Sequence, residues 1–232
     1  MITLKNIDQY YGSSHTLKDV NLTIREGSCT VLMGRNGVGK TTLMQCITGL
    51  VPIRRGDITL GANRTLTKVP AEQRASMGIG YVPQGRQIFP LLTVEENLAI
   101  GLRARTDGQR TIPDLIYSLF PVLKEMRTRR GGDLSGGQQQ QLAIGRALAT
   151  QPEVLLLDEP TEGIQPNVVQ DIGDIIQKLN KEIGLTVLLV EQKLPFARRV
   201  GDHFAIMDRG HVVANGDMSN LGDDLVRQYL TV

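Results

Sequence analysis

Hydrophobic and polar residues alternate in three short stretches of the N-terminal part of the chain. The stretches are ITLKNI at 2–7, VNLTI at 20–24 and GDITL at 56–60. Alternation with a period of two is typical of strands that bury one face and expose the other. These stretches therefore predict a small antiparallel sheet.

Two later stretches are hydrophobic without alternation, EVLLLDE at 153–159 and LTVLLVE at 185–191. Strands that are buried on both faces of a parallel sheet have this pattern. Residues 166–183, between them, have a helical pattern. Its hydrophobic stripe consists of Val168, Ile172, Ile175, Ile176 and Leu179. Strands that alternate with helices predict an α/β core.

Residues 85–130 interrupt this alternation with helical stretches, and no strong strand follows before Val154. This predicts a helical lobe inserted into the α/β core. Within it, the basic stretch KEMRTRR at 124–130 is interpreted as the solvated face of a helix. The C-terminal stretch HFAIMDRGHVVANGDM at 203–218 predicts two short strands joined by a turn, which is a hairpin.

Length and composition indicate one globular domain. The chain has 232 residues, 41% of them hydrophobic, which suffices for one sizeable core with an appended lobe. Its formal charge of +2 is dispersed, so no large nucleic-acid surface is expected. Hydrophobic runs fall far short of the roughly 20 residues of a membrane span, and the N-terminus lacks a signal core, which predicts a cytosolic protein.

The cysteines and histidines give no sign of a metal site held by protein ligands alone. Cys29 and Cys46 are interpreted as free thiols that serve as small packing residues. His15, His203 and His211 lack the spacing of metal ligands.

The strongest local signal is TVLMGRNGVGKTTLMQCITGL at 30–50, which predicts a strand, a glycine-rich loop and a helix with Leu43, Ile47 and Leu50 on its hydrophobic stripe. Glycines let the backbone curl around a phosphate chain and present amides at a helix N-terminus. Lys40 would neutralise the β- and γ-phosphates, and the Thr41 hydroxyl would ligate Mg²⁺. The predicted nucleotide-binding residues here are Gly34, Arg35, Asn36, Gly37, Val38, Gly39, Lys40, Thr41 and Thr42.

Two adjacent carboxylates follow the buried stretch 154–157. Asp158 suits a contact to Mg²⁺, and Glu159 suits a general base that polarises the attacking water. A solvated Asp-Glu pair that opens a loop is the alternative. The phosphate loop in the same chain argues against that alternative and indicates a P-loop nucleotide hydrolase.

A second motif, LSGGQQQQLAIGRAL at 134–148, narrows the class. Ser135 can cap a helix whose first residues, Gly136 and Gly137, leave the backbone open, so the chain offers a second anion-binding helix start. With this motif the chain resembles the ATP-binding cassette (ABC) ATPases over essentially its whole length. The resemblance implies a P-loop NTPase (RecA-like) α/β core with an antiparallel β subdomain and an inserted α-helical subdomain.

The resemblance also implies boundaries, ligands and further site residues. Residues 1–84 and 151–232 would form the core with its β subdomain, and residues 85–150 the helical subdomain. ATP and Mg²⁺ would be the ligands. Tyr11 would stack on adenine, with ordinary strand packing of Tyr10 and Tyr11 as the alternative, and Gln84 would contact Mg²⁺. The signature residues would act on the γ-phosphate of ATP in a second protomer; they are Ser135, Gly136, Gly137 and Gln138.

Three positions depart from the commonest pattern of the family. Gln192 stands in place of a histidine, Gln165 in place of an aspartate, and Gly145 in place of an alanine. These variations resemble the ATPase subunits of branched-chain amino acid and urea importers, the urea type most closely. The amide of Gln192 can touch both a γ-phosphate oxygen and the lytic water but cannot carry a proton away. Glu159 is therefore the predicted base; in an alternative, the site is weakened and a partner ATPase does most of the work.

The predicted function is that of an ATPase subunit that energises an ABC importer from the inner face of the cytoplasmic membrane. Expected partners are permease subunits, a second ATPase subunit of the same or a related kind, and indirectly a solute-binding protein; no nucleic acid is expected. A cytosolic ABC protein that acts on ribosomes or DNA, and a regulatory module without turnover, are the alternatives. Neither the solute nor the choice between homodimer and heterodimer follows from the sequence.

Overall fold

The computed structural model describes residues 1–230, and within them the chain folds into two sheets and a group of helices. The smaller sheet is antiparallel, in the order β2-β1-β4-β5, as the alternating stretches predict. Its strands are β1 (Ile2–Tyr11), β2 (Ser14–Ile24), β4 (Arg55–Leu60) and β5 (Arg64–Thr65).

The core sheet has the order β10-β9-β3-β8-β7-β6. All its pairs are parallel except the antiparallel hairpin β9-β10, which confirms the predicted hairpin. The predicted buried strands are β7 and β8, and β6 is a strand that the hydrophobic pattern did not single out. The strands are β3 (Cys29–Met33), β6 (Ile79–Val82), β7 (Val154–Asp158), β8 (Thr186–Val190), β9 (His203–Asp208) and β10 (His211–Asp217).

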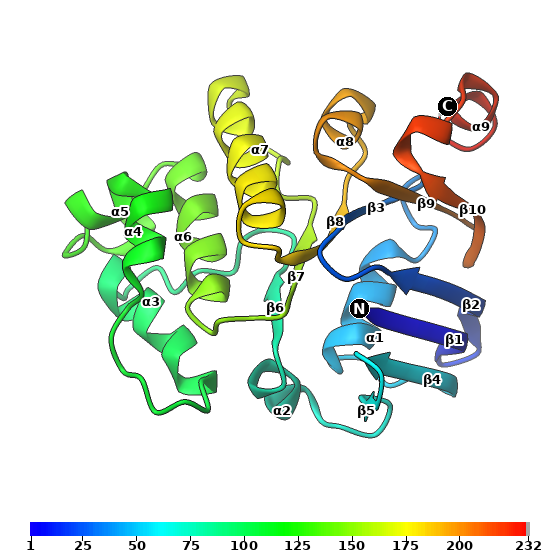
Figure 1. The fold of residues 1–232 in the computed structure, drawn as a ribbon, viewed down its shortest axis with the longest axis horizontal. Helices are drawn as coiled ribbons and strands as arrows, with labels where there is room; N and C mark the ends of the chain where they lie inside the picture. The colour runs from blue at the N-terminus through cyan, green and yellow to red at the C-terminus, as the bar shows by residue number, and fades with distance from the viewer. Residues whose placement is uncertain (231–232) are drawn as a thin grey trace.

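Helices cover both faces of the core sheet and extend it at one end. The helices are α1 (Lys40–Thr48), α2 (Ala71–Ser76), α3 (Val94–Gly101), α4 (Asp114–Leu119), α5 (Pro121–Glu125), α6 (Gly136–Leu148), α7 (Pro166–Lys181), α8 (Leu194–Val200) and α9 (Asp223–Tyr229). Figure 1 shows α3 to α6 gathered at one end of the molecule and the small sheet at the other. The helical lobe expected between Gly85 and Arg130 thus includes α3, α4 and α5.

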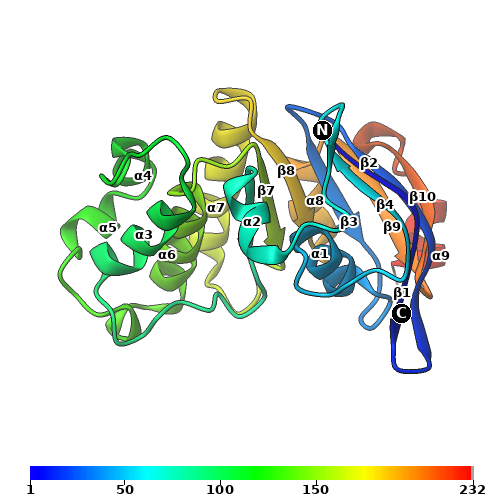
Figure 2. The same cartoon turned by 90° about the horizontal axis from the view of Figure 1, so that it is seen from below.

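The core strands are hydrophobic throughout because their two faces pack into two separate cores. Leu155 and Leu157 of β7 point into a core shared with α6, α7 and α8. Val154 and Leu156 of the same strand point into a second core, shared with α1 and the small sheet. Helix α1 therefore lies between the two sheets (Figure 2). Because both faces are covered, every residue of β7 is buried, as the non-alternating pattern predicts.

Two expected helical features differ in the structure. Helix α1 ends at Thr48 because Gly49, with φ of 80°, reverses the chain, so Leu50 is 59% exposed and lies outside the hydrophobic stripe predicted for it. The basic stretch 124–130 is mostly exposed, but α5 ends at Glu125, so residues 126–130 lie outside a helix.

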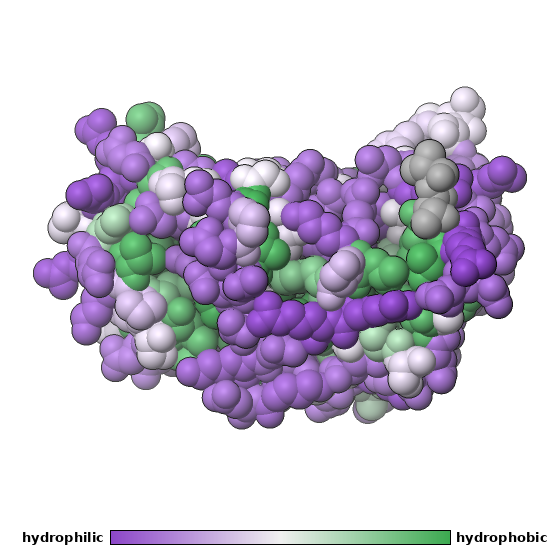
Figure 3. Space-filling model, turned by 90° about the horizontal axis from the view of Figure 1, so that it is seen from above, coloured by the Kyte–Doolittle hydropathy of each residue, from purple (hydrophilic) through white to green (hydrophobic). Residues whose placement is uncertain are grey.

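Both cysteines are free and buried, as expected for packing residues. Burial raises the pKa of each thiol to about 12, so neither is a reactive thiolate at neutral pH. No helix between residues 1 and 230 combines the length and hydrophobicity needed to cross a bilayer. The face that carries α7, α8 and α9 is mainly hydrophilic, with hydrophobic side chains confined to smaller areas (Figure 3).

Candidate active site

The loop between β3 and α1 is shaped by glycines that no other residue could replace without movement. Gly34 has φ of 146°, and a Cβ atom there would lie 2.4 Å from the carbonyl oxygen of Met207. Gly39 has φ of 108°, and its Cβ atom would lie 2.9 Å from the Leu17 side chain. The loop is therefore pressed against β2 and β9, which leaves its other side open to a ligand.

Lys40, the first residue of α1, folds back over this loop. Its Nζ donates hydrogen bonds to the carbonyl oxygens of Gly34 at 2.8 Å and Arg35 at 2.9 Å. Burial lowers the pKa of Lys40, whereas the negative charges of Glu159 and Asp158 raise it. The ammonium group is thus held in place before any ligand binds, and an anion would gain a preformed cationic contact.

Asp158, at the end of β7, is a buried carboxylate that the protein leaves without a hydrogen-bond partner. It is 1% exposed, and neither of its oxygens has a partner among the described residues. Burial raises its pKa to about 6, with the nearby Thr41 hydroxyl and the Lys40 charge acting in the opposite direction. Two unpartnered carboxylate oxygens beside a threonine hydroxyl suit a hard cation such as Mg²⁺.

Glu159 follows in a strained backbone conformation, with φ of 49°. Its amide donates to the carbonyl oxygen of Val190 at 3.0 Å, which pins it to the end of β8. A non-glycine residue in this region is uncommon and costs conformational energy. The conformation turns the chain sharply just after the buried strand, next to the phosphate loop.

Two glutamine amides hold the Glu159 carboxylate, one on each oxygen. The Nε2 of Gln192 donates to one oxygen at 2.6 Å and to Oδ1 of Asn36, in the phosphate loop, at 2.8 Å. The Nε2 of Gln84 donates to the other oxygen at 3.5 Å and to Oε2 of Glu162 at 2.8 Å. Both hydrogens of the Gln192 amide are thereby used within the protein.

These side chains surround a cavity of about 350 Å³. It collects residues from the phosphate loop, from the ends of β6, β7 and β8, and from β2. Nine of its lining residues are predicted ones: Asn36, Gly37, Gly39, Lys40, Thr41, Thr42, Gln84, Glu159 and Gln192. Gly34, Arg35, Val38 and Asp158 support the cavity without lining it.

Two lining residues, Thr16 and Glu162, were not predicted. Thr16 lies on β2 and reaches the cavity only because the small sheet packs against the phosphate loop, so no local pattern marks it. Glu162 stands three residues after Glu159 in the stretch DEPTEG, where a third carboxylate close to the first two was an available signal.

Tyr11 lies at the end of β1, outside the cavity lining. It is 49% exposed, and its hydroxyl donates to Oε1 of Gln45 on α1 at 3.3 Å. Tyr10 is 43% exposed and stacks on the His15 ring, with ring centroids 4.1 Å apart. Tyr10 thus packs on its cross-strand partner, as the strand-packing alternative expects, whereas Tyr11 is about half exposed.

The signature residues lie on the helical lobe and not at this cavity. Ser135 caps α6 as predicted: its hydroxyl accepts from the Gln138 amide at 3.3 Å, and its own amide donates to the Gln138 side chain at 2.9 Å. Gly136 and Gly137 form the first turn of α6. Within one chain the two helix starts are separate, which is what action on a second protomer requires.

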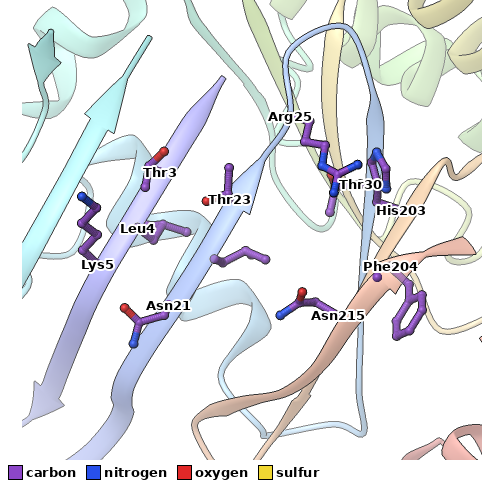
Figure 4. A pocket seen from close by; sticks show the side chains of 12 residues that line it. Thr3, Leu4, Lys5, Asn21, Thr23, Arg25, Thr30, His203, Phe204 and Asn215 are labelled. Atoms are coloured by element: carbon purple, nitrogen blue, oxygen red, sulfur yellow. The ribbon is translucent and has the colours of Figure 1, made fainter. Parts of the chain in front are cut away.

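A second cavity of about 350 Å³ lies between β1 and β2 of the small sheet and β9 and β10 of the core sheet (Figure 4). Arg25, Thr30, His203 and Asn215 are among its lining residues. The side chain of Asp217 pairs with His203 at 2.8 Å and with Arg25 at 3.5 Å, so both basic side chains already have an acidic partner within the protein. Within residues 1–230, the two cavities have no lining residue in common.

Comparison with known proteins agrees with this geometry. The ABC transporter family profile matches residues 17–162, which is more than half of the chain. The high-affinity branched-chain amino acid transport ATP-binding protein BraG of Pseudomonas aeruginosa is 39% identical over 92% of this chain and 91% of its own length. The "Probable branched-chain amino acid transport ATP-binding protein LivF" of Archaeoglobus fulgidus is 37% identical over 95% of this chain and 94% of its own.

Among solved structures, a dimeric ATP-binding cassette in a post-hydrolysis state, bound to ADP and Pi, superposes with a TM-score of 0.84 at 29% identity. The superposition covers 94% of this chain and 99% of the other. This similarity confirms the predicted fold class, a P-loop NTPase core with its two additional parts. The chain therefore belongs to the ABC transporter family, as one of its ATP-hydrolysing ATP-binding cassettes.

Proposed function

We propose that ATP is bound and hydrolysed with Mg²⁺ in the cavity at the phosphate loop, and that this reaction drives an importer of branched-chain amino acids. The observation that carries the proposal is the convergence of Lys40, Glu159, Gln84 and Gln192 from four separate segments on one cavity. The parallel strands β3, β6, β7 and β8 end at the same edge of the core sheet, which brings these segments together.

The phosphates of ATP would lie on the loop of residues 34–42. Loop amides and the N-terminus of α1 favour anions, and Lys40 adds a full positive charge. Tyr11 would contact the adenine with its exposed ring. Both roles are supported by position: the loop lines the cavity, and Tyr11 stands beside α1 through its bond to Gln45.

Mg²⁺ would be held by Thr41, Asp158 and Gln84. The two unpartnered oxygens of Asp158 support this assignment, because a buried carboxylate without a hydrogen bond is costly unless a cation balances it. When bound, the ion supplies positive charge that stabilises the phosphate oxygens during transfer.

Glu159 would act as the base. A water placed beside its carboxylate attacks the γ-phosphorus, the bond from that phosphorus to the bridging oxygen of ADP breaks, and the proton of the water moves to Glu159. Gln192 would help to place this water through Glu159, because its amide holds the Glu159 carboxylate next to Asn36 of the phosphate loop. Since an amide cannot accept the proton, Gln192 assists and does not replace the base.

A complete site would need a second cassette. An open helix start on the lobe, outside the cavity lining, is formed by Ser135, Gly136, Gly137 and Gln138, and it would meet the γ-phosphate of ATP held by another protomer. We accordingly propose a head-to-tail dimer of this chain with itself or with a related subunit. Residues 1–84 and 151–232 would form its core and residues 85–150 its helical subdomain.

A groove of about 300 Å³ lies where the core meets the helical lobe and offers a docking site for a permease. It is lined by Leu50, Tyr81 and Ile100 among others, and Leu50 and Ile100 are exposed. The groove is lined in part by β6, and the loop carrying Gln84 begins just after this strand. A permease segment bound in the groove would therefore influence the position of Gln84 in the active site. The chain would thus sit on the inner face of the cytoplasmic membrane, with a solute-binding protein on the other side.

The identity of the solute rests on relatives. Both relatives described above are named for branched-chain amino acid transport, so we place these solutes before urea. They also favour transport over an action on ribosomes or DNA. The test is uptake of labelled leucine and labelled urea by cells that lack this chain, complemented with the wild type or with Glu159→Gln.

We expect leucine uptake to be lost in the deletion strain and restored by the wild type alone. Restoration by Glu159→Gln would contradict the catalytic role of Glu159. Loss of urea uptake with normal leucine uptake would reassign the solute. Normal uptake of both in the deletion strain would argue against either solute.

A further inference from the structure

We infer that Glu191 is a positioning residue that fixes the base Glu159 and the amide of Gln192 relative to each other. This inference rests on the proposed function, because it concerns the same site. Glu191 is only 3% exposed and stands directly after β8. It does not line the cavity of the phosphate loop, so it would act through its neighbours and not on ATP.

The Glu191 carboxylate joins the two loops that carry the reacting side chains. Its Oε2 accepts from the hydroxyl of Thr161 at 2.7 Å, and Thr161 is two residues beyond Glu159. Its Oε1 accepts from the backbone amides of Gln192 at 2.8 Å and Lys193 at 2.9 Å. One carboxylate thus fixes the loop after β7 and the loop after β8 to each other.

Two further contacts complete this clamp. The Nζ of Lys193 donates to the carbonyl oxygen of Thr161 at 3.1 Å, so the Glu191 and Lys193 side chains both form hydrogen bonds with Thr161. The Glu191 amide donates to the carbonyl oxygen of Leu32 at 3.3 Å, near the end of β3, from which the phosphate loop departs. Glu191 is therefore bonded to the loops after β7 and β8 through its side chain, and to β3 through its backbone amide.

A carboxylate at this depth is retained only where hydrogen bonds or charges satisfy it, so its partners indicate what it holds in place. Its three hydrogen bonds are all directed at loop atoms within two residues of Glu159 or Gln192. Transfer chemistry is sensitive to such placement, because displacing a reacting group by about 1 Å can cost about a hundredfold in rate.

The experiment measures steady-state ATP hydrolysis by the full-length chain in its transporter, with KM for Mg-ATP and kcat determined separately. We expect Glu191→Ala to lower kcat at least about tenfold while KM changes less than about twofold, because the phosphate loop itself is untouched. Glu191→Gln keeps an acceptor for the two amides, and the Thr161 hydroxyl can turn to accept, so we expect it to recover most of kcat.

Asn180→Ala is the matched control. Asn180 is 2% exposed and donates to the carbonyl oxygens of Gly27 and Leu185, both at 3.0 Å, at the opposite end of β8. A comparable loss of thermal stability with kcat retained is expected there. If Asn180→Ala and Glu191→Ala lowered kcat alike in proportion to stability, the positioning role would be overturned.

Thr161→Val provides a milder variant if Glu191→Ala does not fold. It removes only the hydroxyl, and we expect kcat to fall about threefold or more with KM unchanged. In the double variant Glu191→Ala/Gln192→Ala, kcat should fall less than the product of the single effects, because both act on the same placement. Full additivity, or an unchanged kcat in Thr161→Val, would contradict the inference.

Glu159→Gln separates this inference from the proposed function. If Glu159→Gln retains full turnover, the proposed function fails. If it abolishes turnover while Glu191→Ala leaves kcat intact, only the positioning role of Glu191 fails.

Discussion

At the scale of single residues, the site combines a buried carboxylate with a strained backbone position. Asp158 has two unpartnered oxygens in a buried position, and Glu159 holds a strained φ of 49°. Such features lower stability and are retained where a ligand uses them. Asp158 is the last residue of β7 and Glu159 follows it, so the cost is concentrated at the candidate active site.

Asp158 gives a pH-dependent prediction. Its pKa is raised by burial from 3.8 to about 6, so the ionised form is disfavoured in the folded chain. The resulting cost is absent below pH 3.8, grows as the pH rises towards 6 and is complete above it. At about 1.4 kcal/mol for each unit of pKa, the cost near pH 7 is about 3 kcal/mol.

We therefore expect Asp158→Asn to raise the melting temperature of the nucleotide-free chain at pH 7 and to abolish Mg²⁺-dependent hydrolysis. The stability gain should shrink between pH 6 and pH 4, where the wild-type carboxyl takes up its proton. Calorimetry at several pH values measures the change in melting temperature. An ATPase assay measures the loss of Mg²⁺-dependent hydrolysis. A variant that is less stable than the wild type at pH 7 would contradict the conclusion that burial of the ionised Asp158 carboxylate costs stability.

At the scale of elements, the phosphate loop depends on its contact with a neighbouring strand as much as on its own sequence. The close approach of Gly34 to Met207 on β9 is the tightest part of this contact. We expect Gly34→Ala to weaken ATP binding at least tenfold, since both the positive φ and the approach to the backbone forbid a Cβ atom.

Gly184→Ala is a control for backbone strain away from the site. Gly184 has φ of 74°, a Cβ atom there would meet no other part of the described chain within 4 Å, and the residue lies before β8, far from the cavity. It should lose about 1 kcal/mol of stability from backbone strain and keep its affinity for ATP. Isothermal titration calorimetry with a non-hydrolysable ATP analogue compares the affinities of Gly34→Ala and Gly184→Ala. Equal affinities in both variants would show that the contact with Met207 is dispensable.

At the scale of the whole molecule, the cavity and the signature helix start lie on different parts of one chain. A second protomer would complete the site, so ATP should act as a cross-link between protomers. We expect Glu159→Gln, in which ATP would bind without turnover, to dimerise when ATP and Mg²⁺ are added, as measured by sedimentation velocity. A chain that stays monomeric would contradict the homodimer and leave pairing to a related subunit.

Loss of the signature cap should prevent this dimerisation. Ser135→Ala, in the Glu159→Gln background, removes a cap worth about 1 kcal/mol together with the hydroxyl that would meet the γ-phosphate. Thr93→Ala is a close control, because Thr93 forms the same kind of capping box with Glu96 on α3. We expect the two variants to lose similar amounts of stability. Only Ser135→Ala should lose ATP-dependent dimerisation.

The sequence by itself determined what depends on neighbours in the chain. Alternation and continuous hydrophobicity predicted the small sheet, β7, β8 and the final hairpin, because burial of one or both faces follows from local spacing. The loop of residues 34–42 and the cap at Ser135 were equally predictable, since a few adjacent residues fix their backbone. The end of α1 was misplaced at Leu50 because Gly49 terminates the helix before the hydrophobic spacing does.

Tertiary structure alone decided which distant side chains meet. Thr16 reaches the cavity through the packing of two sheets, and Glu191 meets Thr161 because β7 and β8 are parallel neighbours. Neither residue carries a distinctive local pattern: a threonine in an alternating strand and a glutamate at a strand end are both ordinary. Strand order and sheet packing are properties of the whole core, so contacts that depend on them cannot be inferred from local spacing.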